Sequence, residues 1–390
     1  MIKPIVLIIG TRPEGIKMIP VYFALKDAGM PVIICSTWQH NELLSEVYSL
    51  FNIKPEINFD IMRPGQDLFY LTQEILIKIK KVFQEINPSL VLVQGDTTSA
   101  MTAALAAFYL HIPVGHIEAG LRTAFINNPF PEEFNRRVIS MVAQYHFAPT
   151  QDAEKNLHAE KINPATIFCT GNTVVDALFI MKKKIEKQEI IIDKSITDII
   201  ETTKKNKKKL ILLTVHRRES FSEGIRDILK AVKSFARRND EVIFFYPYHP
   251  NPNVTKIIQE IDLVSEPNIF LSPPVSYKEL VYLLLNSDIV ATDSGGICEE
   301  AVSLKKPVLI LRNETERVEA IKAGLAYLVG TQQKNVEDYL GRFMQKTNSL
   351  NKKNTTIFGD GFAAKKIAAI LKDAFKCSQF LNKDIKQSTI

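Results

Sequence analysis

The sequence has few cysteines and no long apolar run, and these absences exclude several classes of protein. Its four cysteines lie far apart without a C-x-x-C pair, so we expect free thiols instead of a disulfide framework or a zinc site. No apolar run reaches the roughly 18–20 residues of a membrane span. The first residues lack the small-residue cleavage site of a secretory signal. We therefore expect a cytoplasmic protein without a membrane span.

Motifs for dinucleotides, P-loop nucleotides and catalytic zinc are also absent. The sequence contains no G-x-G-x-x-G, no Walker A motif and no H-E-x-x-H. Its 49 Lys and Arg against 43 Asp and Glu leave a formal net charge of +6. That charge suits a small anionic substrate but is too weak to indicate nucleic acid. We expect no metal ion and no nucleic-acid partner.

Short apolar runs alternate with segments of helical spacing along the 390 residues. Continuous β-branched runs separated by helices are typical of strands buried on both faces of a parallel sheet. The pattern occurs twice, with a Lys- and Ile-rich stretch over residues 181–209 between the halves, so we place a domain boundary near residue 175. The sequence predicts two consecutive doubly wound α/β units. The expected strands cover residues 5–9, 32–35, 90–93, 113–117 and 145–148, and then 210–215, 242–246, 289–292 and 307–311.

Ligands of open parallel sheets bind beyond the carboxyl ends of the strands, so the polar residues that follow each strand are candidates for a site. Arg12 and Lys17 flank the start of the first helix, where cations suit an anion, although a surface turn with two solvated bases fits equally well. Asp96 follows a strand and is either a helix N-cap or a carboxylate of the site. Glu118 ends another strand, and its alternative role is an ion pair with Arg122.

A further acidic position follows a pair of prolines. Glu132 and Glu133 come directly after Pro131, as expected for acids in the first turn of a helix. That interpretation explains the two acids but not the two arginines that follow closely, Arg136 and Arg137. The segment is therefore another candidate for the site.

Two histidines follow strands in the second half of the chain. His216 is followed by two arginines, which makes this strand end a candidate for binding a phosphate. His249 lies in a proline-dense loop. It either reaches a ligand or only caps the turn.

A glycine pair in the second half carries a more specific signal. Ser294, Gly295 and Gly296 lie between a strand and a helix, where exposed backbone N–H groups form a cradle for an anion. A plain glycine turn with a capping serine is the alternative. One turn further on, Glu300 could accept hydrogen bonds from ribose hydroxyls.

Eleven short segments follow one another from residue 10 to about residue 370: GTRPEGIKM, GDTT, GHIEAGLRT, PFPEEFNRR, YHFAPT, TGNTVVDAL, HRRES, YPYHPNPNV, TDSGGICEEA, LRNETER and FGDGFAAKKI. In this order they resemble the non-hydrolysing UDP-N-acetylglucosamine 2-epimerases. The resemblance implies a GT-B-like fold, with two Rossmann-like domains facing a cleft and a C-terminal helix that crosses back to the first domain. It implies a first domain over residues 1–175, completed by a helix at about residues 362–376, and a UDP-binding second domain over residues 176–361.

The resemblance also implies roles for individual residues. The family's essential acids match Asp96, Glu118 and Glu132, and its essential histidine matches His216. The basic positions around the sugar and the phosphates match Arg12, Lys17 and Arg136. The UDP-binding positions match Ser294, Gly295, Gly296, Glu300 and Arg317.

Some members of this family are activated by a second UDP-GlcNAc beside the active site. The corresponding segments of this chain contain Gln39, His40, Arg63, Gln66 and His249. The family's usual Thr-Gly-Gln-His is Thr37-Trp38-Gln39-His40 here, so a bulky side chain stands where the family has glycine. This departure bears on the activator site and removes none of the charged groups assigned above.

The family interconverts UDP-GlcNAc and UDP-ManNAc for surface polysaccharide synthesis, and it is cytoplasmic and typically dimeric. The resemblance implies the same activity and a homodimer here. The family's route is loss of UDP to give a 2-acetamidoglucal, followed by re-addition, and it needs no cofactor. Asp96, Glu118 and Glu132 would share the proton transfers, and His216 would serve the leaving phosphate.

Other functions remain as alternatives. A hydrolysing relative would release UDP and free ManNAc, and an epimerase of the same kind could act on a related UDP-2-acetamido sugar. A GT-B glycosyltransferase would use the same UDP cradle, but the three acids argue against it. A sensor without activity would lack one of the acids or His216, and all four are present.

Overall fold

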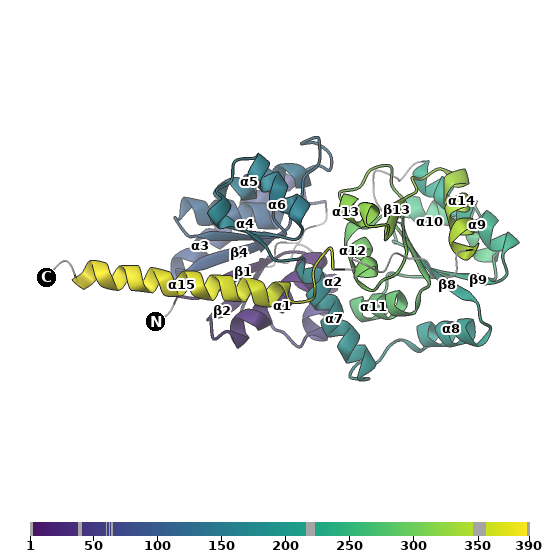
Figure 1. Cartoon of the computed structure of the whole chain (residues 1–390), viewed down its shortest axis with the longest axis horizontal. Coiled ribbons are helices and arrows are strands. Elements are labelled where there is room, and N and C mark those ends of the chain that lie inside the picture. Colours follow the sequence, from purple (N-terminus) through teal and green to yellow (C-terminus); the bar gives the residue numbers. More distant parts are fainter. Residues whose placement is uncertain are drawn as a thin grey trace. The chain divides into compact units, whose positions relative to one another are not determined.

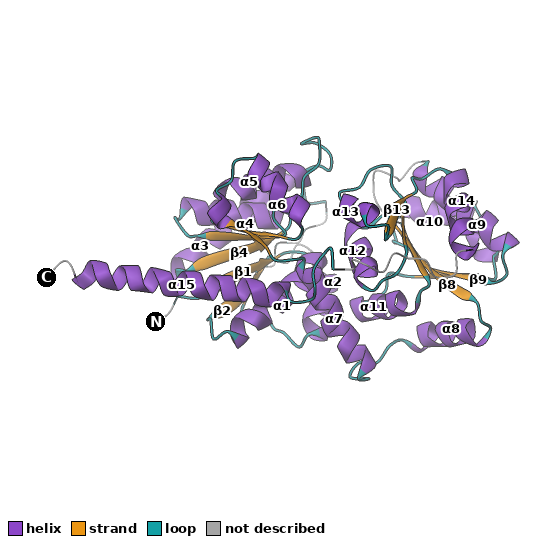
Figure 2. Cartoon of the chain, in the orientation of Figure 1, coloured by secondary structure: helices purple, strands orange, loops and turns teal. Residues whose placement is uncertain are grey.

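The computed structural model describes residues 3–37, 41–59, 61, 63, 65–215, 223–345 and 356–387. The chain forms two compact units, of which unit 1 comprises Met1–Ala177 with Phe358–Ile390 and unit 2 comprises Leu178–Ile357. Each unit is a parallel sheet with helices on both of its faces (Figures 1 and 2). The predicted pair of doubly wound α/β units is therefore confirmed.

The sheet of unit 1 has the order β3-β2-β1-β4-β5-β6-β7, and all its strands are parallel. The direction of winding reverses between β1 and β4, so their carboxyl ends open onto the position where doubly wound sheets bind ligands. The strands are β1 (Ile5–Ile9), β2 (Val32–Ser36), β3 (Ile57–Asn58), β4 (Leu90–Gln94), β5 (Val114–Ile117), β6 (Tyr145–Ala148) and β7 (Ile167–Cys169).

Among the helices of unit 1, α3 buries a single apolar stripe, whereas α1 and α4 are buried on most of their surface. In α3 the buried residues Leu71, Ile75, Ile79 and Phe83 recur every fourth position, the spacing that keeps side chains on one helix face. The helices are α1 (Arg12–Asp27), α2 (Asn41–Leu50), α3 (Leu68–Ile86), α4 (Thr98–Tyr109), α5 (Glu132–Val142), α6 (Gln151–Ala159), the 3₁₀ turn Pro164–Thr166, α7 (Thr173–Glu186), whose last residues belong to unit 2, and α15 (Ala363–Gln387).

The last helix, α15, returns to unit 1 and packs against α1 (Figure 1). Its N-terminus is capped from a distant part of the chain, because Asp176 on α7 accepts hydrogen bonds from the backbone N–H groups of Ala363 (3.2 Å) and Ala364 (2.9 Å). The crossing back is as expected, but the helix is longer than the predicted 362–376. None of the helices in the described ranges combines the length and apolar character that a membrane span needs.

Unit 2 has a sheet of the order β10-β9-β8-β11-β12-β13, and its winding reverses between β8 and β11. The strands are β8 (Lys209–Thr214), β9 (Val242–Pro247), β10 (Ile269–Ser272), β11 (Ile289–Thr292), β12 (Val308–Ile310) and β13 (Ala326–Leu328). The helices are α8 (Lys194–Lys205), α9 (Gly224–Arg238), α10 (Pro252–Glu260), the 3₁₀ turn Leu263–Ser265, α11 (Tyr277–Asn286), α12 (Gly295–Ser303), α13 (Val318–Lys322) and α14 (Gln333–Gln345).

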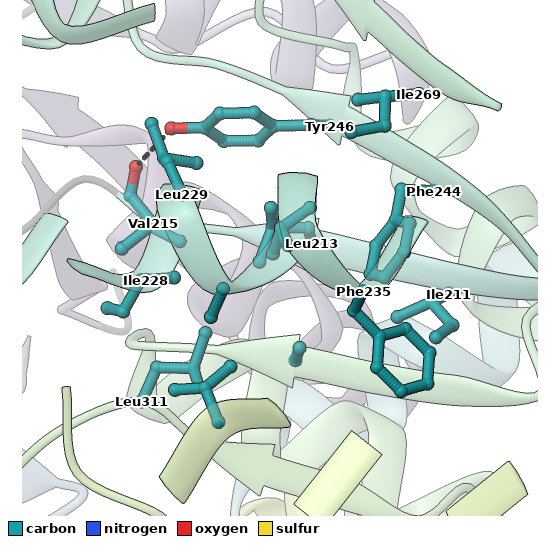
Figure 3. Close-up of a cluster of buried hydrophobic side chains, with 14 of the residues drawn as sticks. Ile211, Leu213, Val215, Ile228, Leu229, Phe235, Phe244, Tyr246, Ile269 and Leu311 are labelled. Atoms are coloured by element: carbon teal, nitrogen blue, oxygen red, sulfur yellow. Dashed lines mark hydrogen bonds between the residues drawn. The ribbon is translucent and has the colours of Figure 1, made fainter. Parts of the chain in front are cut away.

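The core of unit 2 lies between the sheet and α9, where Leu213, Leu229 and Phe244 are fully buried (Figure 3). Tyr246 is buried among them, and its hydroxyl donates a hydrogen bond to the Val215 carbonyl oxygen (3.1 Å; Figure 3). This bond satisfies the one polar group of a buried tyrosine. It also fixes the carboxyl end of β8 to the neighbouring strand β9.

The four strands β3, β7, β10 and β13 are absent from the sequence-based prediction. Each has only two to four residues, and two of them close the outer edges of each sheet. Edge strands are short and partly exposed, so their sequences lack the continuous apolar run that marks a central strand.

Candidate active site

A buried carboxylate occupies the carboxyl end of β5. Glu118 is 6% exposed, and its backbone has a φ of 65°, a strained value for a residue other than glycine. The Lys17 ammonium lies 2.7 and 2.6 Å from its two carboxylate oxygens, and the Asn172 side-chain amide donates to Oε1 at 2.9 Å. The Gln94 amide donates to Oε2. These donors stabilise a negative charge that burial alone would disfavour.

The alternative pairing of Glu118 with Arg122 is wrong. Arg122 instead pairs with Glu160 through two hydrogen bonds of 2.7 Å, a bidentate arrangement on the outside of the unit. Lys17, which lies 101 positions before Glu118 in the chain, takes the place that Arg122 was considered for.

The second acid, Asp96, follows β4 and pairs with Arg136. The Nη1 atom of Arg136 lies 2.6 Å from Asp96 Oδ2. Loss of contact with water raises the pKa of Asp96, Arg136 opposes that shift, and the nearby charges of Glu118 and Glu132 add to it. The suggestion that Asp96 caps a helix is wrong, because the N-cap of α4 is Thr97, whose hydroxyl accepts from Ala100 N–H (3.0 Å).

The two adjacent glutamates at the start of α5 have different surroundings. Glu133 is fully buried and accepts from Arg136 Nε (3.0 Å) and from Arg137 Nε (2.8 Å), so it explains both arginines. Glu132 is half-buried, and its buried Oε2 atom has no hydrogen-bond partner among the described residues. The acid with an available oxygen is therefore Glu132.

Another buried acid, Glu14, was not among the predicted site residues. It lies in the first turn of α1 and is 1% exposed. Its carboxylate accepts from Gly10 N–H (3.0 Å) and from the hydroxyls of Thr11 (2.8 Å) and Thr97 (2.6 Å). Glu14 therefore joins the loop that precedes Arg12 to the loop that carries Asp96. Burial raises its pKa to about 7 against these hydrogen bonds.

In unit 2, the turn from β11 into α12 has the predicted form. Ser294 is the N-cap residue of α12, and its side chain makes no capping hydrogen bond within the described part of the chain. The helix therefore begins with backbone N–H groups that its own cap leaves available, next to Gly295 and Gly296. A β-carbon at Gly295 would lie 2.6 Å from the Arg317 guanidinium carbon, so a larger residue here would require Arg317 to move.

Arg317 belongs to a network of buried charges that the sequence did not reveal. Its Nε and Nη2 atoms lie 2.8 and 2.7 Å from one oxygen of Glu299. Glu316 is shared by Arg317 (3.4 Å) and Arg312 (3.1 Å). The guanidinium group is thus held in one place against the helix N-terminus.

Glu300 has a separate partner in unit 2. The buried hydroxyl of Tyr277, on α11, donates to Glu300 Oε1 at 2.8 Å. The bond fixes the orientation of a carboxylate that was predicted to accept from a ribose. Sequence spacing could not show this contact, because 23 residues separate the two side chains.

Comparison with known proteins identifies the family. The sequence model of UDP-N-acetylglucosamine 2-epimerase matches residues 24–372. The UDP-N-acetylglucosamine 2-epimerase of Campylobacter jejuni is 43% identical over 375 residues, which are 95% of this chain and 98% of the relative. The protein of the same name from Escherichia coli K12 is 41% identical over 95% of this chain and 98% of its own length. The chain belongs to the UDP-N-acetylglucosamine 2-epimerase family.

Solved structures of this family have the same fold. The chain is similar to a UDP-GlcNAc 2-epimerase from Neisseria meningitidis bound to UDP-GlcNAc, with a TM-score of 0.85, 42% identity, and coverage of 94% of this chain and 99% of that one. It is also similar to the enzyme from Methanocaldococcus jannaschii in complex with UDP-GlcNAc and UDP, with a TM-score of 0.81 and 33% identity over the same shares of the two chains. The expected GT-B-like class is confirmed.

Some predicted residues lie outside the described part of the chain, and others belong to loops. His216, Gln39 and His40 belong to segments that the structure does not describe. Arg63 and Gln66 form a turn before α3, in which Arg63 N–H donates to Gln66 Oε1 (3.3 Å). His249 Nδ1 accepts from Asn251 N–H (3.2 Å), which is the turn-capping role considered for it.

Arg12 is the first residue of α1 and is half-buried, close in sequence to the buried Glu14. Within the described ranges, no group of three or more His, Cys, Asp or Glu side chains has the arrangement needed to hold a metal ion. In unit 1 the candidate charged groups are the acids with Lys17 and Arg136, and in unit 2 they are Arg312 and Arg317 with their glutamates.

The raised pKa of Glu14 predicts a pH-dependent cost to stability. Its folded pKa is about 7 against an ordinary 4.5, so between these values the folded protein holds a proton that the unfolded chain has lost. Stability therefore falls as the pH rises through this window, by about 2–3 kcal/mol in total. The Glu14→Gln variant lacks this dependence. Its free energy of unfolding minus that of wild type should therefore increase by about 2–3 kcal/mol from pH 5 to pH 8. Urea unfolding at both pH values measures it.

A matched control is Glu160→Gln, which removes a carboxylate from the outside of unit 1. Arg122 lowers the pKa of Glu160, so this group is ionised throughout the window and its removal shifts stability equally at both pH values. Parallel stability profiles for Glu14→Gln and wild type would contradict the prediction.

Proposed function

We propose that the protein is a non-hydrolysing UDP-GlcNAc 2-epimerase, which interconverts UDP-GlcNAc and UDP-ManNAc without a cofactor. The observation that carries the proposal is the set of three acids in unit 1, each in a different electrostatic environment. Family membership names the substrate, since a relative of 42% identity has a structure bound to UDP-GlcNAc. We place the enzyme in the cytoplasm, as a supplier of precursors for surface polysaccharides.

The chemistry requires acid and base groups near C2 of the sugar. The C2 hydrogen is not acidic until the bond from C1 to the diphosphate oxygen begins to break. The electron pair of that bond leaves with UDP, a base removes the C2 proton, and a C1–C2 double bond forms in the 2-acetamidoglucal. Re-addition returns a proton to C2 from the opposite face and the diphosphate oxygen to C1.

The three acids differ in ways that suit these proton transfers. Glu118 has donors on both oxygens, which favours its charged form, whereas burial raises the pKa of Asp96, so Asp96 takes up a proton more readily than an ordinary aspartate. Groups whose environments differ in this way are typical of acid and base pairs. Glu132 adds an oxygen without a hydrogen-bond partner in the described part of the chain. We therefore assign the proton transfers to Asp96, Glu118 and Glu132 together.

Unit 2 is proposed to hold the UDP group. The N-terminus of α12 at Ser294, Gly295 and Gly296, with the buried Arg317 beside it, provides hydrogen-bond donors and positive charge for a diphosphate. We assign the ribose contact to Glu300, whose carboxylate is oriented by Tyr277. Electrostatic stabilisation of the leaving diphosphate is the largest contribution that such a site can make.

We further propose that the enzyme is a homodimer. The neighbouring helices α3, α4 and α5 expose large apolar side chains, among them Phe69 (87% exposed), Tyr109 and Met141 (74% exposed). Large apolar side chains exposed on adjacent helices suit a protein interface. Sedimentation equilibrium should give twice the 44.1 kDa of one chain for wild type, and a monomer for the double variant F69E/M141E. A wild-type monomer at micromolar concentration would contradict the proposal.

Incubation with UDP-GlcNAc in D2O tests the reaction directly. Proton NMR should show UDP-ManNAc, with deuterium at C2 of both sugars as the reaction approaches equilibrium. Asp96→Asn, Glu118→Gln and Glu132→Gln should each lower kcat by at least about 100-fold, the usual contribution of a general acid or base. Glu160→Gln serves as the control and should keep the wild-type rate.

Each other outcome of this experiment identifies an alternative. Free ManNAc and UDP as the main products would assign the protein to hydrolysing enzymes. Inactivity on UDP-GlcNAc, with turnover of another UDP-2-acetamido sugar, would change the substrate. Full activity of Glu118→Gln would refute its catalytic role.

The two adjacent glycines of α12 offer a matched pair of variants for the UDP site. A β-carbon at Gly295 would displace Arg317, whereas one at Gly296 would meet no atom within 4 Å. Gly295→Ala should therefore lower both thermal stability and UDP affinity. Gly296→Ala should leave the stability of the free protein unchanged or slightly higher, because alanine favours helix formation over glycine.

Binding of UDP to the Gly296→Ala variant then tests whether the diphosphate binds at the N-terminus of α12. If the diphosphate approaches the backbone at this turn, the added methyl group should weaken UDP binding at least about 10-fold, as measured by calorimetry. Unchanged UDP affinity in both variants would exclude the N-terminus of α12 as the diphosphate site.

A further inference from the structure

Asn172 is buried, and its polar atoms have distinct partners. It lies directly before α7 and is 2% exposed. Its side-chain oxygen accepts from Val174 N–H (3.1 Å) at the start of α7. Its side-chain nitrogen donates to Glu118 Oε1 (2.9 Å), and its backbone N–H donates to the Phe358 carbonyl (2.7 Å). The bond to α7 fixes which end of the amide faces Glu118, since only the nitrogen can donate.

The backbone contact comes from the segment that returns to unit 1. Phe358 is the first residue of that return, and Gly359 follows it. Gly171 has a φ of 92°, and a β-carbon there would lie 3.0 Å from the Gly359 α-carbon. The two backbones therefore touch at Gly171 and at the backbone N–H of Asn172, which ties the backbone of Asn172 to the returning segment.

We propose that Asn172 is a positioning residue for Glu118, and that the returning segment at Phe358 and Gly359 holds Asn172 in place. The inference rests on the proposed catalytic role of Glu118. Asn172 is not a catalytic residue, since it does not touch the reacting atoms. It acts by directing one oxygen of Glu118, while Gln94 directs the other and Lys17 bonds to both.

The geometry gives the reason why a neutral donor is needed at this point. The carboxylate of Glu118 is held by donors from distant parts of the chain, namely Lys17, Gln94 and Asn172. Lys17 bonds to both oxygens and can follow the carboxylate as it turns, because its ammonium is carried on a flexible stem. The side-chain amide of Asn172 is anchored at α7 and its backbone N–H at Phe358, so the donor to Glu118 has a fixed direction.

Two variants separate positioning from helix capping. Serine is a good helix cap, so Asn172→Ser keeps the cap of α7 and loses only the donor to Glu118, whereas Asn172→Ala loses both. Positioning predicts that both variants lower kcat for UDP-GlcNAc by about 10- to 100-fold, with KM changed less than about 3-fold. If capping were the only role, Asn172→Ser would keep the wild-type kcat.

The pH profile of kcat gives a second measurement. Loss of one donor disfavours the charged form of Glu118, so the limb of the profile that Glu118 sets should move to higher pH in Asn172→Ser. The other charged groups near Glu118, Lys17 and Asp96, are unchanged in this variant, and burial lowers the pKa of His116 in β5 to about 3, so it stays neutral. A purely structural defect would lower kcat equally at every pH.

The returning segment is tested with a pair of glycine variants. Gly359 has a φ of 123°, and a β-carbon there would lie 3.3 Å from the backbone nitrogen of Asn172. Gly359→Ala should therefore disturb Asn172 and lower kcat. Gly29→Ala is the control, because Gly29 also has a positive φ, of 75°, but a β-carbon there meets nothing within 4 Å. In an Asn172→Ser background, Gly359→Ala should lower kcat by much less than it does alone, since both changes act through one contact.

The outcomes distinguish this inference from the proposed function. Wild-type kcat and pH profile in Asn172→Ser, together with an inactive Glu118→Gln, would overturn the positioning role and leave the function intact. Full activity of Glu118→Gln would remove the basis of both. Additive effects of Asn172→Ser and Gly359→Ala would overturn the part assigned to the returning segment.

Discussion

The structure of unit 1 depends on keeping the charge of Glu118 in a place from which water is largely excluded. A buried carboxylate is costly unless donors surround it. Those donors are Lys17 on α1, Gln94 at the end of β4 and Asn172 before α7, so three elements must be in place before the charge is stable. The switch point between β1 and β4 permits this, because the strand ends there lie side by side.

Unit 2 meets the opposite requirement, since it must keep positive charge buried next to a helix N-terminus. Arg317 is only 9% exposed, and Glu299 and Glu316 neutralise it. An incoming diphosphate would meet a guanidinium whose position is already fixed, so little conformational entropy is lost on binding. The absence of a side chain at Gly295 is the condition that lets the guanidinium approach the helix this closely.

The sequence alone predicts most of the fold and part of the site. Central strands such as β4 and β8 are continuous apolar runs, so pattern reveals them, whereas edge strands such as β3 are too short to leave a pattern. The segments that resemble the family assign Asp96 and Glu118 to the site. The partners Gln94 and Glu299 were not found, because residue type shows neither burial nor a contact between distant parts of the chain.

The same contacts imply that the site forms only when unit 1 is complete. Lys17 and Glu118 are 101 positions apart, and Phe358, which holds Asn172, follows only after the whole of unit 2 has been made. Contacts of such long sequence separation must overcome a large loss of chain entropy, and the α15 cap at Asp176 adds two hydrogen bonds toward that end. A chain that ends before Phe358 would keep every acid of the site and still lack the contact that orients Glu118 through Asn172.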